Sequence, residues 1–285
     1  STSTAQHNVA IGVTSLDAVT TGDDNVGIGY DALTANTSGS YNTAVGMSAL
    51  RYSTTASHNT GVGYNSLSDN TSGTANTGLG SRSLVLNTQG SNNTAVGKEA
   101  LKVNTTGSRN IAVGTGALDA PDTENDNLAI GYDALGGSIA GGELNVAIGN
   151  YSLDANTSGD NNVAVGYNSL TGNTEGINNT AVGNSALASN TTANKNVAVG
   201  HLALTANTTG YANTSSGTES LIANTTGSYN VSVGYEALKS NTTGGNNIGI
   251  GRAGDVITTG SDNITIGQDA DPSANSASNQ IVIGS

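Results

Sequence analysis

One phrase of 17 residues recurs along the whole chain, and this repeat constrains the fold more than any other feature. The Gly that closes Asn-x-Ala-Val-Gly and its variants occurs seventeen times, from Gly12 to Gly284. Every step is 17 residues, except one of 18 after Gly131 and one of 16 after Gly251. A repeat of fixed length predicts an array whose units pack on their neighbours, because a globular core has a different shape to fill in each part.

The positions of the repeat, numbered from its Asn so that the marker Gly is position 5, differ in what they accept. Position 1 is Asn in sixteen copies and Gln280 in the last, and position 4 is aliphatic in all but Ser216. Position 9 is Leu in the first fourteen copies, after Ala or Ser at position 8. Positions 12 to 15 usually read Asn-Thr-Thr/Ser-Gly. The last copies lose the Leu, so we expect variant terminal coils over 252–285.

These constraints predict an all-β parallel β-solenoid, or β-roll, of about 17 coils. Seventeen residues are too few for a helical hairpin repeat, and Gly with Asn-Thr clusters disfavours continuous helix. Thr/Val-Ala-Val alternates as a strand does, and Asn-Thr-Thr-Gly is typical of a turn. We expect a single domain over 1–285, with an irregular coil near 119–145 where the 18-residue step falls.

Strand alternation leads us to place positions 2, 4 and 9 inside the coil and position 3 outside. Position 3 is small and never charged, which indicates close approach of another backbone and hence a homo-oligomer; the alternative is that small residues merely suit a tight coil. On this assignment Val182→Asp or Leu187→Asp would bury an unpaired charge and break the stacking.

The position-1 asparagines are expected to form a ladder along the stacking axis, because stacked Asn rows stabilise repetitive β-structures. The ladder comprises Asn8, Asn25, Asn42, Asn59, Asn76, Asn93, Asn110, Asn127, Asn145, Asn162, Asn179, Asn196, Asn213, Asn230, Asn247 and Asn263.

The repeat resembles a known family. NTAVGMSAL from Asn42 and NTAVGKEAL from Asn93 resemble the head repeats of YadA-like trimeric autotransporter adhesins, and the related repeats of bacteriophage and marine bacterial fibre proteins. The resemblance covers Asn8 to Gly284 and implies a left-handed parallel β-roll with three chains side by side. The adhesin repeat is shorter, because this one has the additional Asn-Thr-Thr-Gly turn.

Composition argues against several functions. A net charge of −13 with eight basic residues disfavours nucleic-acid binding, and no apolar run approaches the length of a membrane helix. The chain has no Cys, which excludes disulfides and thiolate metal sites. Its three His are isolated, so we predict no enzyme activity, no catalytic residue and no cofactor. Gly-rich strings such as 27–29 belong to the structural repeat.

The segment 119–127 has the strongest clustering of acidic residues. Carboxylates at Asp119, Asp122, Glu124 and Asp126 could bind Ca²⁺. Their spacing matches neither an EF-hand nor the calcium-roll motif, so we favour a solvated loop and predict no metal site.

Glycans are a second class of candidate ligand. Eight Asn-x-Ser/Thr sequons fall in the position-12 turn and would form a row if that turn is exposed; the alternative is that they match by turn composition alone. They are Asn36, Asn70, Asn104, Asn156, Asn190, Asn207, Asn224 and Asn241. O-linked sugars on the Thr rows are a further possibility. Recurrent Tyr residues could stack on sugars.

We therefore expect a non-catalytic structural subunit of an extracellular fibre, on a cell surface, in a secreted filament or in a virion. Its expected partner is itself, in a lateral trimer, a head-to-tail filament, or both, because the partial coils at the two ends nearly complement each other; a segment of a longer rod is the alternative. An adhesin head or phage tail-fibre shaft that binds cell-surface glycans is the alternative function. Ice binding is less favoured, because the Thr rows lack a regular Thr-x-Thr strand motif.

Overall fold

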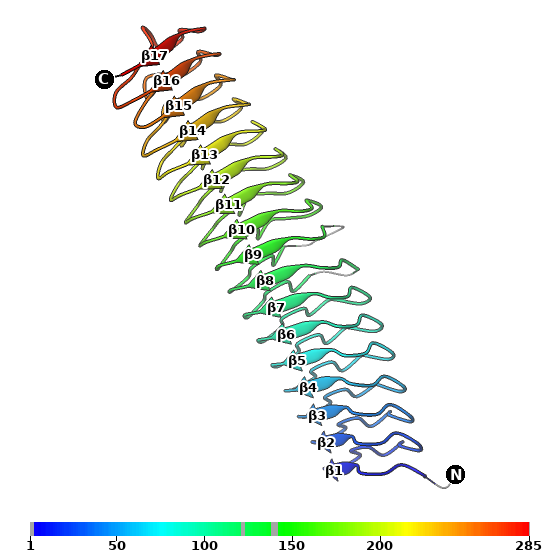
Figure 1. Ribbon diagram of the computed structural model, residues 1–285. Coiled ribbons are helices and arrows are strands. Elements are labelled where there is room, and N and C mark those ends of the chain that lie inside the picture. The colour runs from blue at the N-terminus through cyan, green and yellow to red at the C-terminus, as the bar shows by residue number, and fades with distance from the viewer. Residues whose placement is uncertain (1–2, 121–122, 138–141, 285) are drawn as a thin grey trace. The chain divides into compact units, whose positions relative to one another are not determined.

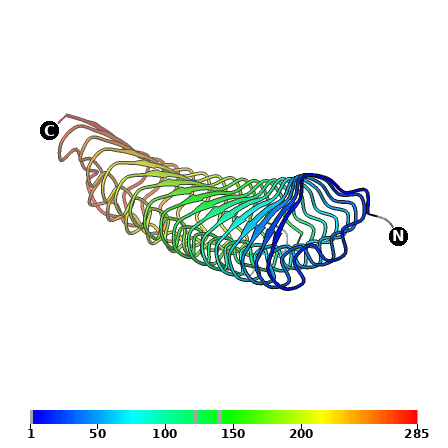
Figure 2. The same ribbon diagram turned by 90° about the horizontal axis from the view of Figure 1, so that it is seen from below.

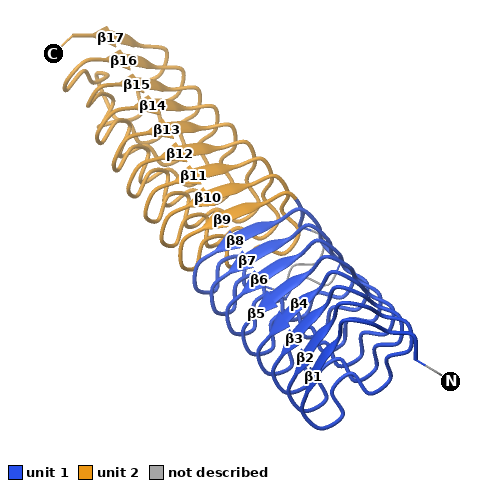
Figure 3. Cartoon of the chain, turned by 60° about the horizontal axis from the view of Figure 1, so that its bottom comes forward, with its two compact units in different colours: residues 1–143 blue, residues 144–285 orange. Residues whose placement is uncertain are grey.

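The computed structural model describes residues 3–120, 123–137 and 142–284, and they form an all-β parallel β-solenoid (Figure 1). The chain divides into two compact units, unit 1 at Ser1–Glu143 and unit 2 at Leu144–Ser285 (Figure 3). In each unit every repeat makes one coil with one three-residue strand at positions 2 to 4. The expected fold class and the 17-residue period are confirmed.

Unit 1 has eight strands that pair in parallel with their neighbours in sequence. They are β1 (Val9–Ile11), β2 (Val26–Ile28), β3 (Thr43–Val45), β4 (Thr60–Val62), β5 (Thr77–Leu79), β6 (Thr94–Val96), β7 (Ile111–Val113) and β8 (Leu128–Ile130). Each pairing joins the same repeat position, so identical positions lie directly over one another.

Unit 2 has nine strands with the same parallel, in-register pairing. They are β9 (Val146–Ile148), β10 (Val163–Val165), β11 (Thr180–Val182), β12 (Val197–Val199), β13 (Thr214–Ser216), β14 (Val231–Val233), β15 (Ile248–Ile250), β16 (Ile264–Ile266) and β17 (Ile281–Ile283). Seen from below, successive coils of each unit follow one another with the same outline (Figure 2).

The marker Gly at position 5 is required by the backbone. Gly183 has φ +139°, in a region that is essentially restricted to Gly. A Cβ atom on it would lie 2.3 Å from the carbonyl oxygen of Gly200 in the next coil. The backbones of successive coils therefore approach as closely as they do only because neither residue has a side chain.

The coil interior is built from positions 3, 8 and 9, and our assignment of the strand faces was wrong. The middle residue of each strand from β2 to β16 is buried, whereas positions 2 and 4 are half-buried or exposed. Ala181, Ala186 and Leu187 are each 0% exposed, while Val182 is only half-buried. Position 3 is small because the fully buried Leu at position 9 already fills the narrow interior. The prediction for Leu187→Asp keeps its physical basis, and that for Val182→Asp loses it.

The coil that begins with β15 replaces this core by a different one. The single-residue deletion after Gly251 lies in the turn, so Leu238 still donates to the Ala253 carbonyl at 3.0 Å. Gly254 then takes the place of the Leu at position 9, and Ile257 takes the place of the Asn at position 12. A Cβ on Gly254 would lie 2.8 Å from Thr265 Oγ1 and 3.2 Å from Ile257 Cδ1. Two larger side chains thus fill the volume that the Leu vacates.

Candidate functional site

The outer face of the strands is the most distinctive surface of both units. Positions 2 and 4 point outward there in two parallel rows, and none of these residues is charged. In unit 2 the exposed fractions are 38% for Val197 and 40% for Val199; in unit 1 they are 39% for Leu79 and 42% for Ile111. We call these two rows the outer strand face. Within each unit most of its residues are Val, Ile or Leu; the exceptions are threonines at position 2 and Ser216.

Rows of buried asparagines hold successive coils together. Asn42 donates from its backbone N–H at 3.0 Å and from Nδ2 at 3.1 Å, both to Oδ1 of Asn25. The second Nδ2 hydrogen of Asn42 reaches the Ala56 carbonyl at 2.9 Å. In unit 2, Asn230 bonds to Asn213 in the same way, at 3.0 and 3.1 Å. The expected row of position-1 amides is therefore present, and backbone and side chain both take part in it.

A second buried Asn row occupies position 12, so the sequons of this turn do not form an exposed row of glycan acceptors. Asn190 donates from Nδ2 to Asn173 Oδ1 at 2.8 Å and to the Ala193 carbonyl at 3.1 Å, so neither amide hydrogen is free. The folded coil has no room for a glycan on these side chains. All eight residues are 0% exposed: Asn36, Asn70, Asn104, Asn156, Asn190, Asn207, Asn224 and Asn241.

The position-12 row ends where the repeat changes. Asn241 Oδ1 is buried and has no hydrogen-bond partner, because the next residue in the row is Ile257. Sequence reasoning missed this row, since Asn-Thr-Thr-Gly is equally typical of an exposed turn. Other sequons do lie at the surface: Asn92 and Asn178, both at position 17, are exposed.

The threonines of the same turn fall into two classes. At position 13 the hydroxyl is used by the fold: Thr208 Oγ1 donates to the Thr225 carbonyl at 3.1 Å, and Thr225 Oγ1 to the Thr242 carbonyl at 3.1 Å. At position 14, Thr209 and Thr226 are exposed. The Thr rows therefore do not form one flat array.

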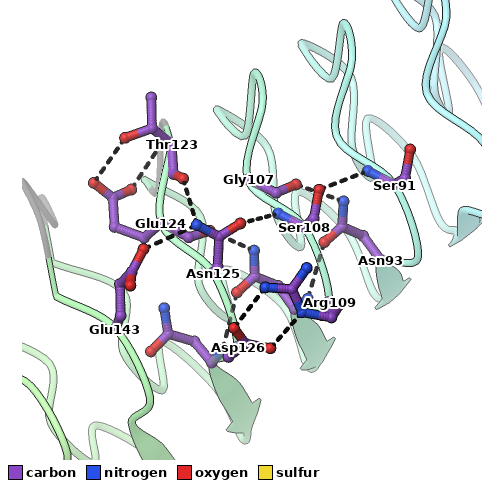
Figure 4. Close-up of polar contacts among 12 residues, drawn as sticks. Ser91, Asn93, Gly107, Ser108, Arg109, Thr123, Glu124, Asn125, Asp126 and Glu143 are labelled. Atoms are coloured by element: carbon purple, nitrogen blue, oxygen red, sulfur yellow. Dashed lines mark hydrogen bonds and ion pairs between the residues drawn. The ribbon is translucent and has the colours of Figure 1, made fainter.

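The acidic segment around 119–127 does not gather its carboxylates on one point (Figure 4). Asp126 accepts two hydrogen bonds from Arg109, at 2.6 and 2.7 Å, and these bonds lower the pKa of its carboxyl. Glu124 accepts from the backbone N–H of Thr123 at 3.0 Å. Asp119 is partly desolvated, which raises its pKa. Asp122 lies outside the described residues, and among the others no group of three or more potential metal ligands occurs.

Histidine and tyrosine side chains make short contacts along the coil edges. His7 lies 3.3 Å from Asp24, and His58 stacks on Tyr41 with 4.9 Å between ring centroids. Tyr211 and Tyr229 meet edge to face at 4.9 Å. His201 is exposed in a different unit from the other two histidines. These rings offer surface for stacking.

A network of charged side chains lies over the last coils of unit 2. Lys239 Nζ lies 2.8 Å from Glu236 and 3.5 Å from Asp255, and Arg252 reaches Asp255 at 3.8 Å. Asp271 occupies position 9, where the regular coils have Leu. Its Oδ1 is buried without a partner, and desolvation followed by the charge of Asp255 raises its pKa.

No known family, curated protein or solved structure matches this chain. Within the part of the chain that the structure describes, no helix could cross a membrane.

Proposed function

We propose that the chain is a non-catalytic structural subunit of an extracellular fibre, and that copies associate side by side through the outer strand face. The observation that carries this proposal is the pair of outward apolar rows at positions 2 and 4. An apolar stripe of this length on a soluble protein is typical of an interaction surface. The resemblance to YadA-like and fibre repeats supports the same reading and suggests three chains.

The spacing of the outer strand face favours a second copy of this chain as the partner. Its side chains recur once per coil, at the separation of paired strands, about 4.8 Å. Another ladder with the same rise can interdigitate along its whole length, whereas an irregular surface matches only locally. The face has no charge of its own, so the net charge of −13 resides elsewhere on the surface and does not oppose the contact.

Association is tested by the mass of the protein in solution. Sedimentation or native mass spectrometry should give roughly three times the 28.0 kDa chain mass for a trimer. Val165→Lys with Val182→Lys should reduce the mass to that of a monomer, because two charges would be desolvated in the contact. Asn184→Lys, on an exposed position outside the face, is the matched control. A wild-type monomer at all concentrations would overturn the lateral contact.

The fibre itself is tested by electron microscopy of material from the natural source. Filaments or stiff rods at the cell surface, in the medium or on virions are the expected result. Globular particles confined to the cell interior would contradict both the fibre and the extracellular location. Head-to-tail contacts of such subunits give open filaments, and lateral contacts alone give rods of one chain's length.

The alternative function, an adhesin or tail-fibre shaft that binds glycans, draws on the exposed aromatic pairs. Tyr211 and Tyr229 are 45% and 54% exposed and in mutual contact. Paired tyrosines present an amphipathic surface suited to sugar rings. Binding on a glycan array that is lost in Tyr211→Ala and Tyr229→Ala, with the oligomer intact, would favour this function.

A further inference from the structure

Two adjacent threonines have opposite surroundings in five turns of unit 2. Thr242 Oγ1 donates to the Thr258 carbonyl at 3.0 Å and is part-buried. Thr243, the next residue, is exposed, and its hydroxyl has no hydrogen-bond partner among the described residues. The same contrast recurs at 191–192, 208–209 and 225–226, where the hydroxyl of the first threonine donates a hydrogen bond to a backbone carbonyl of the next coil. The exposed member stands at position 14, so unit 2 has a row of free hydroxyls.

Position 14 is restricted to hydroxyl side chains although the fold makes almost no use of them. All sixteen described residues at this position are exposed, and fourteen are Ser or Thr; Gln89 and Glu175 are the exceptions. Among the described residues, one hydroxyl of this row makes an intramolecular hydrogen bond, from Thr123 to Glu124 at 3.4 Å. The fourteen are Thr4, Thr21, Ser38, Thr55, Ser72, Thr106, Thr123, Ser158, Thr192, Thr209, Thr226, Thr243, Thr259 and Ser276.

Two structural explanations for this restriction fail. Exposed position 6 accepts Tyr30, Met47, Lys98, Asn184 and His201, so exposure alone does not select hydroxyls. Turn chemistry favours Gly, Asn and Asp as strongly as Ser, yet no Gly, Asn or Asp occurs among the sixteen. The pattern is accounted for if another molecule reacts with, or binds to, the hydroxyl itself.

We propose that the exposed hydroxyls at position 14, above all Thr192, Thr209, Thr226 and Thr243, are sites of O-linked glycosylation by neutral sugars. The proposal is independent of lateral association but rests on the extracellular location of the proposed function. Phosphorylation fits less well, because a row of doubly charged groups one coil apart, about 4.8 Å, would repel each other on an already acidic chain.

The transfer needs an activated sugar and an external transferase. The threonine Oγ1 attacks the anomeric carbon of a nucleotide- or lipid-phosphate-linked sugar, a C–O glycosidic bond forms, and the bond from the sugar to the phosphate breaks. The hydroxyl proton passes to a base on the transferase, and the phosphate leaves with the bonding electron pair. The chain contributes only the acceptor, so its recognition depends on the exposure of the turn.

One tryptic peptide separates this proposal from its alternatives. Cleavage after Lys239 and Arg252 releases 240–252, which contains the buried Asn241, the hydrogen-bonded Thr242 and the free Thr243. Electron-transfer fragmentation of this peptide, from protein purified from its natural source, assigns any sugar to one of these three residues or to Ser240. We expect it on Thr243, released by β-elimination and resistant to peptide N-glycosidase.

The outcomes are distinct from those of the fibre test. A sugar on Ser240, Asn241 or Thr242, or an unmodified peptide from native material, would overturn the proposal even if the protein is trimeric. In the native host, Thr243→Val should abolish the modification of this peptide, and Thr242→Val should leave it. Loss of the sugar in both variants would mean that the transferase does not distinguish the two environments. Oligomer mass, measured on the same sample, reports the lateral association separately.

Discussion

Oδ1 of Asn162 accepts two hydrogen bonds from Asn179, one from its backbone N–H at 2.9 Å and one from Nδ2 at 3.2 Å. Asn179 in turn offers its own Oδ1 to the backbone N–H of Asn196 at 3.0 Å. Each asparagine thereby joins its coil to both neighbours just before the strand begins. Since this contact is fully buried, a slip of one residue between coils would leave amide groups without partners.

Asn179→Ala should destabilise the protein substantially. The substitution removes the two Nδ2 bonds, to Asn162 Oδ1 and to the Ala193 carbonyl, and leaves the buried backbone N–H of Asn196 unpaired. Buried unsatisfied groups cost about 1–3 kcal/mol each, so we expect a loss on the order of 3 kcal/mol in thermal or chemical unfolding. Asn184→Ala, at an exposed site, is the control, and equal effects of the two variants would contradict the role of the row.

Much of this fold was predictable because the length of the sequence repeat equals the number of residues in one coil. The Leu at position 9 and the Asn at position 1 stand in register in the sequence and in the structure. Alternation did not predict which strand residues point into the coil, because in a three-residue strand either the middle residue or the two outer residues can face inward. We assumed that the larger side chains lie inside. The signal against this was the restriction of position 3 to mostly Ala, Gly and Ser. The structure gives the reason at Gly78, where a Cβ would lie 2.6 Å from the inward Ser66 Oγ.

The position-12 row and the glycan sites show a second limit. Asn-Thr-Thr-Gly specifies a turn, but turn composition does not say whether the amide points into the coil. The rows at positions 1 and 12 share one acceptor: Asn25 and Asn36 both donate from Nδ2 to the Gly39 carbonyl at 2.9 Å. Only the closed coil brings these two positions, eleven residues apart in sequence, to the same oxygen.

Ala181→Asp and Val182→Asp should have different consequences. Ala181 is 0% exposed, so Asp there buries an unpaired charge and should prevent stable stacking of nearby coils, at a cost of several kcal/mol or more. Val182 points outward, so Asp there should leave the secondary structure intact but weaken lateral association. Circular dichroism and sedimentation separate the two effects. A folded, stable Ala181→Asp variant would refute the face assignment.

Gly245→Ser should stabilise unit 2. In neighbouring coils the residue at position 16 is Ser, and its hydroxyl accepts the backbone N–H of the previous coil, as Ser228 does from Tyr211 at 3.1 Å. Gly245 cannot accept from Ser228, although a Cβ there would lie 3.9 Å from the Ser228 nitrogen. The added bond should contribute about 0.5–1.5 kcal/mol. An unchanged or lower melting temperature would show that the 3.1 Å approach of this Cβ to the Ser228 carbonyl oxygen outweighs the bond.

Stability should depend on pH through Asp271. Burial and the nearby Asp255 carboxylate raise the pKa of Asp271 in the folded state. A raised carboxyl pKa means that the contribution to stability is present below the unfolded pKa and is lost as pH rises through the folded pKa. Asp271→Asn should therefore raise the melting temperature at pH 7 and have less effect near pH 4, both measured by calorimetry. A lower melting temperature at pH 7 would mean that the charged form is favoured there, for example by Lys239 and Arg252 acting through Asp255.

The altered core around Gly254 should behave as a coupled set. Gly254→Leu alone should be strongly destabilising, because its side chain would meet Ile257, Thr265 and Leu238. Ile257→Ala alone should open a cavity and cost about 2–5 kcal/mol.

The triple variant Gly254→Leu, Ile257→Asn, Thr265→Ala restores the regular residues at positions 9, 12 and 3. Since φ of Gly254 is +67° and φ of Leu238 is +51°, the backbone already suits a Leu at this position. The amide introduced by Ile257→Asn would also reach the unpaired Asn241 Oδ1. We expect the triple variant to be at least as stable as wild type in chemical unfolding, with a favourable coupling energy in the mutant cycle; additive losses would show that the three substitutions are independent.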